Sequence, residues 1–278
     1  MNARRAWLAA GVILVAAWGG VRAQGPDANG VLAKAREALG GEKRLAAIRT
    51  IVIEGETRQV RGDNLVPIVF QTNIELPDRY SRRDETPATE SGYTTSGFVG
   101  DALIQLPIPL TPPAAPQRAT RVTSLKQDFT RLMLGMFAAS QPAYPLTFTR
   151  IGVAESPQGK ADVIEAKGPE NFVARLLINQ DTHLPVMLSW TAPAGRTGGA
   201  PPAAARGAAP PAASPAPASP AAAPPESRLF YADYRDVDGI QLPFRIRRAV
   251  GSETVEETTV DRYKLNAKID PKKFEVIK

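Results

Sequence analysis

A β-hairpin is encoded in residues 231–243, which read YADYRDVDGIQLP. The segment Asp236-Val237-Asp238-Gly239 has the Asp-Gly chemistry of a tight turn, in which glycine adopts a positive φ without steric cost. Strand-forming runs flank this turn at Arg228–Tyr234 and Ile240–Ala249. One strand therefore leads directly into the next, without the crossover helix that a parallel pair requires. The sequence predicts antiparallel pairing here.

The same pattern of strand, short turn and strand extends over most of the chain. Further strands are predicted at 51–56, 68–76, 79–86, 97–106 (a hairpin turning at Gly100-Asp101), 146–153, 162–167, 172–178, 184–191 and 254–264. The polar run 79–86 is typical of a strand at a solvated sheet face. With about ten or eleven strands and two helical segments, the predicted fold is mostly β (α+β) around one large antiparallel sheet.

Two segments have helical periodicity. An N-terminal helix is predicted between a cap at Asp27 or Asn29 and the terminating pair Gly40-Gly41. A longer amphipathic helix is predicted at 120–139, after a Pro-rich loop at 107–116. Its apolar stripe consists of Val122, Leu125, Phe129, Leu132, Met133, Met136 and Phe137, and its polar face carries Lys126, Gln127, Asp128 and Arg131. Because a sheet of this size usually curls, we expect this helix to cover the concave face.

Residues 1–23 have the layout of a cleaved secretory signal peptide. Arg4 and Arg5 precede an uncharged run over residues 6–21, and Val21-Arg22-Ala23 matches a small-residue cleavage pattern. The run is shorter than the roughly 20 apolar residues that span a bilayer, and an uncleaved anchor is the alternative. We predict a soluble, exported protein in the periplasm of a Gram-negative-type bacterium, with no transmembrane span in the mature chain.

Residues 192–227 form an insert of a different composition, with 15 Ala and 10 Pro and no Leu, Ile, Val or aromatic residue. Such a segment has nothing to bury and is predicted to be a disordered loop. We predict one domain over residues 24–278, interrupted by this insert, because the segments on either side look like neighbouring strands of one sheet. Loop-closure entropy rises only slowly with loop length, so a long insertion is tolerable there. A docking site for a partner that reads Pro-rich peptides is the alternative.

The composition excludes several kinds of chemistry. One His and no Cys rule out Cys-His zinc sites, multi-His sites and disulfides. His183 is interpreted as a turn residue, and the acidic turn 233–239 fails as a calcium loop because Tyr234 and Arg245 would occupy ligand positions. No nucleophile elbow, phosphate-binding loop or zincin motif is present. Without the signal the net charge falls from +6 to +3, too weak for a nucleic-acid footprint. We expect no catalytic residue, cofactor or metal.

The amphipathic helix and a facing strand supply the candidate ligand-binding residues. The predicted apolar lining consists of Phe70, Ile74, Phe129, Leu132, Met133 and Met136. Methionine beside leucine and phenylalanine makes an adaptable surface that suits hydrocarbon ligands. We predict that Leu132→Glu or Met136→Glu abolishes acyl binding and leaves a folded protein. The same spacing also fits a helix that simply fills a core, and the pattern does not separate the two.

Four stretches resemble the bacterial outer-membrane lipoprotein-sorting (LolA/LolB-like) superfamily. They are Ala38-Leu39-Gly40-Gly41-Glu42 running into Ile48-Arg49-Thr50-Ile51, then 76–80, 177–186 and the hairpin 231–243. The resemblance implies an open, incomplete antiparallel β-barrel whose helices close its mouth and whose apolar cavity holds acyl chains. The loop 107–116 and the insert 192–227 are unlike the dedicated carrier, and no binding residue is carried over. We therefore expect a divergent relative.

These observations lead to three functional hypotheses of different classes. The first is a periplasmic, non-enzymatic binding or carrier protein for lipid, lipoprotein acyl chains or another apolar ligand held inside an open β half-barrel. The second is an envelope protein–protein interaction module whose barrel is filled by its own side chains. The third is an envelope hydrolase in which two carboxylates meet in space without a sequence motif. A hollow interior under the helix at 120–139 would favour the first.

Overall fold

The computed structural model describes residues 27–87, 92–156, 159–191 and 225–276. The predicted signal peptide, residues 1–23, lies outside these ranges, as do residues 192–224 of the predicted insert. Glu226 and Ser227, which we assigned to the insert, instead belong to a strand. The assignment of residues 24–278 to one domain stays a prediction.

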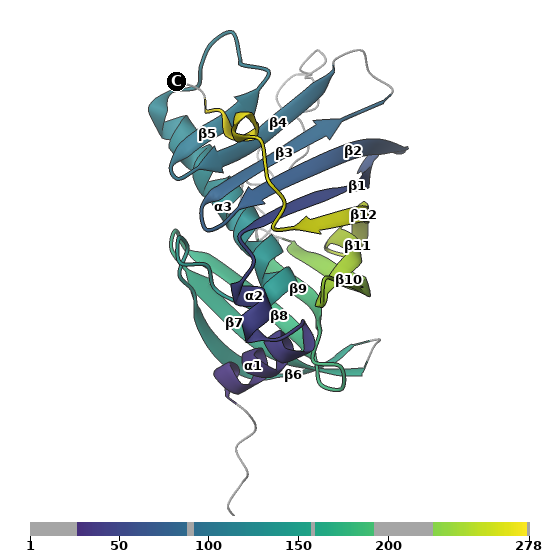
Figure 1. Cartoon of the computed structure of the whole chain (residues 1–278). Helices are drawn as coiled ribbons and strands as arrows, with labels where there is room; N and C mark the ends of the chain where they lie inside the picture. Colours follow the sequence, from purple (N-terminus) through teal and green to yellow (C-terminus); the bar gives the residue numbers. More distant parts are fainter. Residues whose placement is uncertain (1–26, 88–91, 157–158, 192–224, 277–278) are drawn as a thin grey trace, which may run out of the picture.

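Twelve strands of the described residues form one antiparallel sheet, in the order β5-β4-β3-β2-β1-β12-β11-β10-β9-β8-β7-β6 (Figure 1). Their bounds are β1 Thr50–Arg61, β2 Asn64–Glu75, β3 Arg79–Glu85, β4 Tyr93–Val99, β5 Ala102–Leu106, β6 Thr147–Ser156, β7 Gly159–Gly168, β8 Phe172–Asn179, β9 Pro185–Thr191, β10 Glu226–Val237, β11 Ile240–Val250 and β12 Glu253–Leu265. Because β5 and β6 are not paired with each other, the sheet is open. The predicted mostly-β fold with an open antiparallel half-barrel is confirmed. The sheet has twelve strands, one more than the eleven at the upper end of the prediction.

The hairpin at residues 231–243 forms as the sequence predicts. Val237 pairs with Ile240, and the two turn residues Asp238 and Gly239 have φ values of 54° and 81°. Both positive φ values are those of the tight turns that match the twist of a hairpin. On the other side of β10, Glu226 pairs with Thr191 of β9. The strands on either side of the insert are therefore direct neighbours.

Three α-helices and a 3₁₀ turn accompany the sheet in the described ranges: α1 Ala28–Ala38, α2 Glu42–Ala46, α3 Ala115–Phe137 and η1 Pro271–Phe274. Asp27 caps α1, with its Oδ1 accepting from the Gly30 N–H at 2.7 Å. Helix α3 crosses the concave side of the sheet, as expected of the covering helix (Figure 1). It begins five residues before the predicted start. Pro116 lies in its first turn, where proline needs no N–H partner, so the Pro-rich loop ends earlier than expected.

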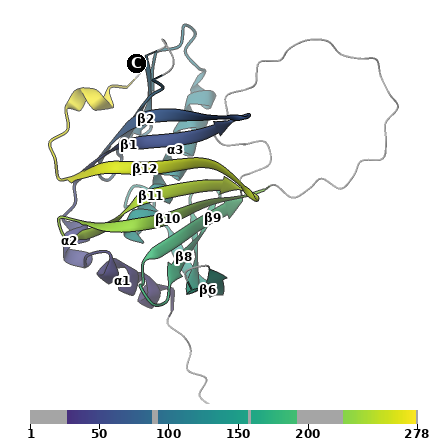
Figure 2. The same cartoon turned by 90° about the vertical axis from the view of Figure 1, so that its right-hand side faces the viewer.

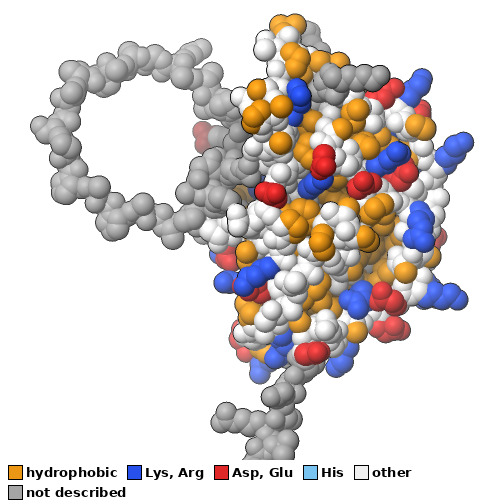
Figure 3. Space-filling view, turned by 90° about the vertical axis from the view of Figure 1, so that its left-hand side faces the viewer, with side chains coloured by type: hydrophobic (Ala, Val, Ile, Leu, Met, Phe, Trp, Pro, Cys, Tyr) orange, Lys and Arg blue, Asp and Glu red, His pale blue; other side chains and the backbone are white. Residues whose placement is uncertain are grey.

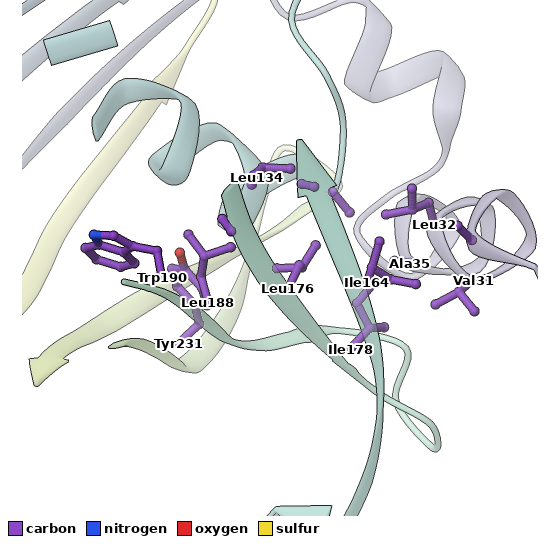
Figure 4. Close-up of a cluster of buried hydrophobic side chains, with 14 of the residues drawn as sticks. Val31, Leu32, Ala35, Leu134, Ile164, Leu176, Ile178, Leu188, Trp190 and Tyr231 are labelled. Carbon is purple, nitrogen blue, oxygen red and sulfur yellow. The ribbon is translucent and has the colours of Figure 1, made fainter. Parts of the chain in front are cut away.

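The buried hydrophobic side chains form two clusters, one on each side of α3. Leu134 belongs to the cluster with α1 and β6–β10, whereas Met133 and Met136 belong to the cluster with β1–β5, β11 and β12. Figure 4 shows the first cluster, in which Leu134 and Leu32 face side chains of β7 and β8. Because the sheet curls around α3, this helix is buried on two faces and not on one.

Two of the stretches that carry the family resemblance meet at one end of the half-barrel. The Gln241 N–H donates to the Leu39 carbonyl at 2.9 Å, which joins the end of α1 to the β10–β11 hairpin. Gly40 has a φ of 132°, and a Cβ at this position would overlap the carbonyl oxygen of Gly239. Only glycine fits this approach. The α1–α2 unit therefore closes this end of the sheet.

Candidate ligand-binding cavity

The side chains on the concave face change in character along each central strand. In β1, Ile51 and Ile53 are buried, whereas Gln59 and Arg61 follow on the same face toward the turn into β2. We call the strand ends beside α1 and α2 the closed half, and the ends beside the turns at 62–63 and 251–252 the open half. Figure 2 shows the two halves on opposite sides of the molecule.

A cavity of about 690 Å³ lies between the open half of the sheet and α3. Its apolar lining consists of Ile53, Ile68, Phe70, Val260 and Tyr263 from β1, β2 and β12, Leu125 and Leu132 from α3, and Leu229, Tyr231 and Ile246 from β10 and β11. Trp190 of β9 completes one wall. The cavity is therefore built from strands at both ends of the chain together with one helix.

Polar side chains line the same cavity, and several of them form hydrogen bonds or ion pairs with one another. Arg82 lies over the Phe70 ring at 4.3 Å, and its Nε donates to Asp84 Oδ1 at 2.7 Å. Burial by itself lowers the pKa of Arg82, but the neighbouring Asp84 carboxylate outweighs this effect, so the pKa is raised. Glu256 Oε2 accepts from the Gln59 amide at 3.1 Å. These pairs keep charged groups beside an apolar surface without leaving them unpaired.

Three tyrosines of the cavity wall stay protonated to high pH. Burial raises the pKa of Tyr80 to about 12 and also raises the pKa values of Tyr231 and Tyr263. The Tyr263 hydroxyl donates to the Pro243 carbonyl at 2.6 Å. Tyr231 packs directly beneath Gly135 of α3, where a Cβ would overlap its ring. The absence of a side chain at Gly135 therefore lets α3 lie close to β10.

The structure places the six predicted lining residues in two environments. Phe70 and Leu132 line the cavity. Ile74, Phe129 and Met136 are packed in the hydrophobic core, and Met133 is core as well, bordering a separate pocket beside α2. That any of the six contacts a ligand stays a prediction.

Several cavity residues escaped the sequence analysis. The strand at 79–86 was assigned to a solvated face, yet Tyr80, Arg82 and Asp84 line the cavity. Arg131 was placed on the polar face of its helix, yet it is only 9% exposed. In both cases the curl of the sheet buries a polar surface that a single strand or helix would leave in water. The alternation at Tyr80, Arg82 and Asp84 was visible in sequence, but nothing indicated which face is concave.

The described residues contain neither a cluster of potential metal ligands nor a helix that could span a membrane. No group of three or more His, Cys, Asp or Glu among them could hold a metal ion. His183 lies in the turn between β8 and β9 with a φ of 58° and is not among the residues that line the cavity. None of the helices in the described ranges is long and apolar enough to cross a bilayer.

An open antiparallel sheet curled around one helix, with a cavity beneath that helix, places this protein in the class of β half-barrels. No protein-family model and no curated protein sequence matches the chain. A LolA superfamily protein from Nitrosomonas europaea has a similar structure, with a TM-score of 0.53 and 15% identity over 90% of this chain and 98% of that one.

Two further solved structures have the same architecture. A DUF1329 family protein from Desulfovibrio piger matches with a TM-score of 0.51 and 10% identity, over 89% of this chain and 97% of that one. A domain from Vibrio parahaemolyticus, named for outer-membrane lipoprotein sorting, matches with a TM-score of 0.50 and 8% identity. The match covers 89% of this chain and 97% of that one. The chain therefore has the LolA-like fold, at identities that fit a divergent relative. The resemblance inferred from the sequence is confirmed at the level of the fold.

Proposed function

We propose that this protein is a non-enzymatic periplasmic binding or carrier protein for lipid, lipoprotein acyl chains or another apolar ligand. The observation that carries the proposal is the cavity of about 690 Å³ between the open half of the sheet and α3. Its volume lies within the range of roughly 300–1,000 Å³ of small-ligand pockets. An interior filled by its own side chains, as the interaction-module hypothesis requires, would leave no such space.

Binding would be driven by burial of hydrocarbon on the floor of the cavity. Ile68 and Phe70 of β2 and Val260 of β12 line the cavity together with Leu132 of α3. Each methylene removed from water contributes roughly 0.8 kcal/mol, so an acyl chain provides ample driving force without any covalent step. This mode of binding needs neither a cofactor nor a metal.

The similar structures and the N-terminal sequence support the proposed role and compartment. One structure is that of a LolA superfamily protein, and another is named for outer-membrane lipoprotein sorting. The layout of residues 1–23 as a signal peptide agrees with an envelope protein. The ligand would then be an acyl chain that needs shielding from water between two membranes.

The test is acyl binding by the purified mature protein and by a cavity variant. Leu132→Glu places a charge on the cavity wall, so we expect its affinity for a fluorescent fatty acid to fall at least about tenfold. Gln117→Glu is the matched control, because Gln117 is exposed on the same helix and lies outside the cavity. Unchanged binding in Leu132→Glu would contradict the cavity as the site. No probe uptake, with no co-purified lipid in native mass spectrometry, would overturn the proposed function.

A second candidate function is interaction with an envelope protein partner through the surface, which does not require a filled barrel and which the exposed loop between β5 and α3 favours. Ile108 is 59% exposed and Leu110 is fully exposed in this loop. Figure 3, which faces the side of the molecule with β5 and α3, shows hydrophobic side chains in patches between charged ones. Ile108→Ser with Leu110→Ser should leave acyl binding unchanged and weaken only an interaction with a partner.

A further inference from the structure

Two arginines lie close to the ring of one tryptophan in the wall of the cavity. The guanidinium carbon of Arg131, on α3, is 4.6 Å from the centre of the Trp190 ring, and that of Arg248, on β11, is 5.8 Å from it. All three residues line the same cavity as Phe70 and Val260. The fold thus brings two cations from distant parts of the chain to one aromatic side chain beside an apolar floor. Figure 4 shows Trp190 at the end of its cluster that is remote from α1.

Arg131 is buried with part of its hydrogen-bonding capacity unused. Its Nη1 donates to Asp128 Oδ1 at 2.7 Å, but the Asp128 side chain is itself 66% exposed. Its Nε is buried from solvent and has no partner in the described residues. An unsatisfied donor on a charged group is costly to bury, so its retention needs an explanation.

Arg248 also has an unused hydrogen-bond donor, because its Nε is buried without a partner in the described residues. Its cross-strand neighbour Glu256 accepts a hydrogen bond from Gln59 instead. Burial lowers the pKa of Arg131, and the positive charge of Arg248 lowers it further. Of these two cations only Arg131 has a carboxylate partner among the described residues, and that carboxylate is exposed, whereas Arg82 is paired with Asp84.

The aromatic surroundings hold the Arg131 guanidinium in place without neutralising it. Besides Trp190, the Phe172 ring lies 5.3 Å from its guanidinium carbon. Stacking on aromatic rings leaves the edge of a guanidinium free to donate paired hydrogen bonds to an oxyanion. Arg131 and Trp190 also border a second cavity of about 650 Å³ on the far side of this wall. Arg131 therefore stands at the boundary between the two cavities.

We propose that Arg131 and Arg248 form a subsite for the anionic head group, a carboxylate or a phosphate, of an amphiphile whose acyl chain lies on the floor of the cavity. This proposal rests on the proposed function, because the acyl chain occupies the same cavity. An oxyanion between the two guanidinium groups would supply the missing acceptor and relieve the repulsion between them. The protein would then select anionic amphiphiles over neutral ones of equal chain length.

The experiment compares matched amphiphiles with the mature protein. Palmitate and hexadecanol have the same chain length and differ in head-group charge, and phosphatidate and diacylglycerol form a second pair. Trp190 is the only tryptophan outside residues 1–23, so its fluorescence reports directly from the subsite. We expect the wild type to prefer each anionic member, and Arg248→Gln to weaken anionic binding by about tenfold or more while leaving neutral binding unchanged.

Arg248→Gln is the primary variant because Arg248 is only half-buried, and circular dichroism verifies its fold. Arg247→Gln is the matched control, since Arg247 is the adjacent residue and lies exposed over Phe230.

The possible outcomes separate the subsite from the carrier function. If anionic and neutral amphiphiles bind equally well, and Arg248→Gln does not change their binding, the subsite is overturned and the carrier function stands. Binding of inorganic phosphate alone, with the same sensitivity to Arg248→Gln, would replace the amphiphile subsite with a free-anion site. Failure of every amphiphile to bind would overturn the proposed function and the subsite with it.

Discussion

The closed and open halves of the half-barrel are built from the same strands, but the closed half is a packed core and the open half borders a cavity. In β11, Leu242 and Phe244 are buried in the core of the closed half, whereas Ile246 and Arg248 continue along the same face into the cavity. The closed half is covered by α2, the end of α1 and the last turns of α3, and its large apolar side chains are buried in the two hydrophobic clusters. The open half has no second layer beyond α3, so a space remains.

Along each strand, the residues of the closed half therefore contribute mainly to stability, whereas those of the open half line the proposed binding cavity. Hydrophobic burial stabilises the protein where the interior is packed, and a cavity forgoes part of that energy. Helix α3 belongs to both regions, because Met133 and Met136 are packed in its last turns while Leu125 and Leu132 face the cavity. Changes at successive turns of one helix should therefore have different consequences.

The largest expected effect is that of a charge placed in the closed half. Met136 is fully buried, so Met136→Glu should lower the free energy of unfolding by about 4 kcal/mol or more. This changes our sequence-based expectation that Met136→Glu leaves a folded protein. Urea denaturation followed by circular dichroism measures the loss. Met136→Leu, which keeps the volume and polarity, should cost less than about 1.5 kcal/mol. A well-folded Met136→Glu would mean that the closed half is not packed as described.

A somewhat smaller effect is expected where α3 crosses β10. A Cβ at Gly135 would overlap the Tyr231 ring, so Gly135→Ala should destabilise the protein by about 2–3 kcal/mol despite the higher helix propensity of alanine. Thermal unfolding measures the change. Combining it with Tyr231→Ala should cost less than the two single changes together, because the clash is removed. Simple additivity would show that the helix and the strand are not in direct contact.

The smallest expected effect of a single residue is that of Tyr80, in the cavity wall, at alkaline pH. Burial raises the pKa of Tyr80 to about 12 from an ordinary value of 10.0. Between these values the unfolded chain releases a proton that the folded chain keeps, so the free energy of unfolding falls as the pH rises. Tyr80 alone should account for about 2 kcal/mol by pH 12, and Tyr231 and Tyr263 act in the same direction. Urea midpoints measured from pH 8 upward check this; Tyr80→Phe should flatten the slope, and an equal slope in both proteins would contradict it.

The sequence was sufficient for most of the elements because their signals are local. Alternating apolar residues in β1 and β2 and the Asp-Gly turn between β10 and β11 predicted strands that the structure contains. The early start of α3 was missed because Pro116 was interpreted as loop, although proline also fits a first helical turn. Such errors arise where one residue type suits two neighbouring conformations.

The candidate site was predicted only in part, for a different reason. Phe70 and Leu132 were identified from apolar spacing, and both line the cavity. The same spacing also selected Ile74, Phe129 and Met136, which are packed in the core. An apolar stripe indicates that a face is buried, but it does not indicate whether protein atoms or empty space lie opposite that face.

The antiparallel order of hairpins, the covering helix and the LolA-like resemblance could be predicted from the sequence, because turns, periodicity and short motifs are properties of neighbouring residues. The position of the hollow interior and the meeting of Arg131 and Arg248 at Trp190 became known from the three-dimensional structure. Those three residues lie far apart in the chain, and their meeting depends on how strongly the sheet curls around α3. Curvature is a collective property of twelve paired strands, and no single segment of the chain specifies it.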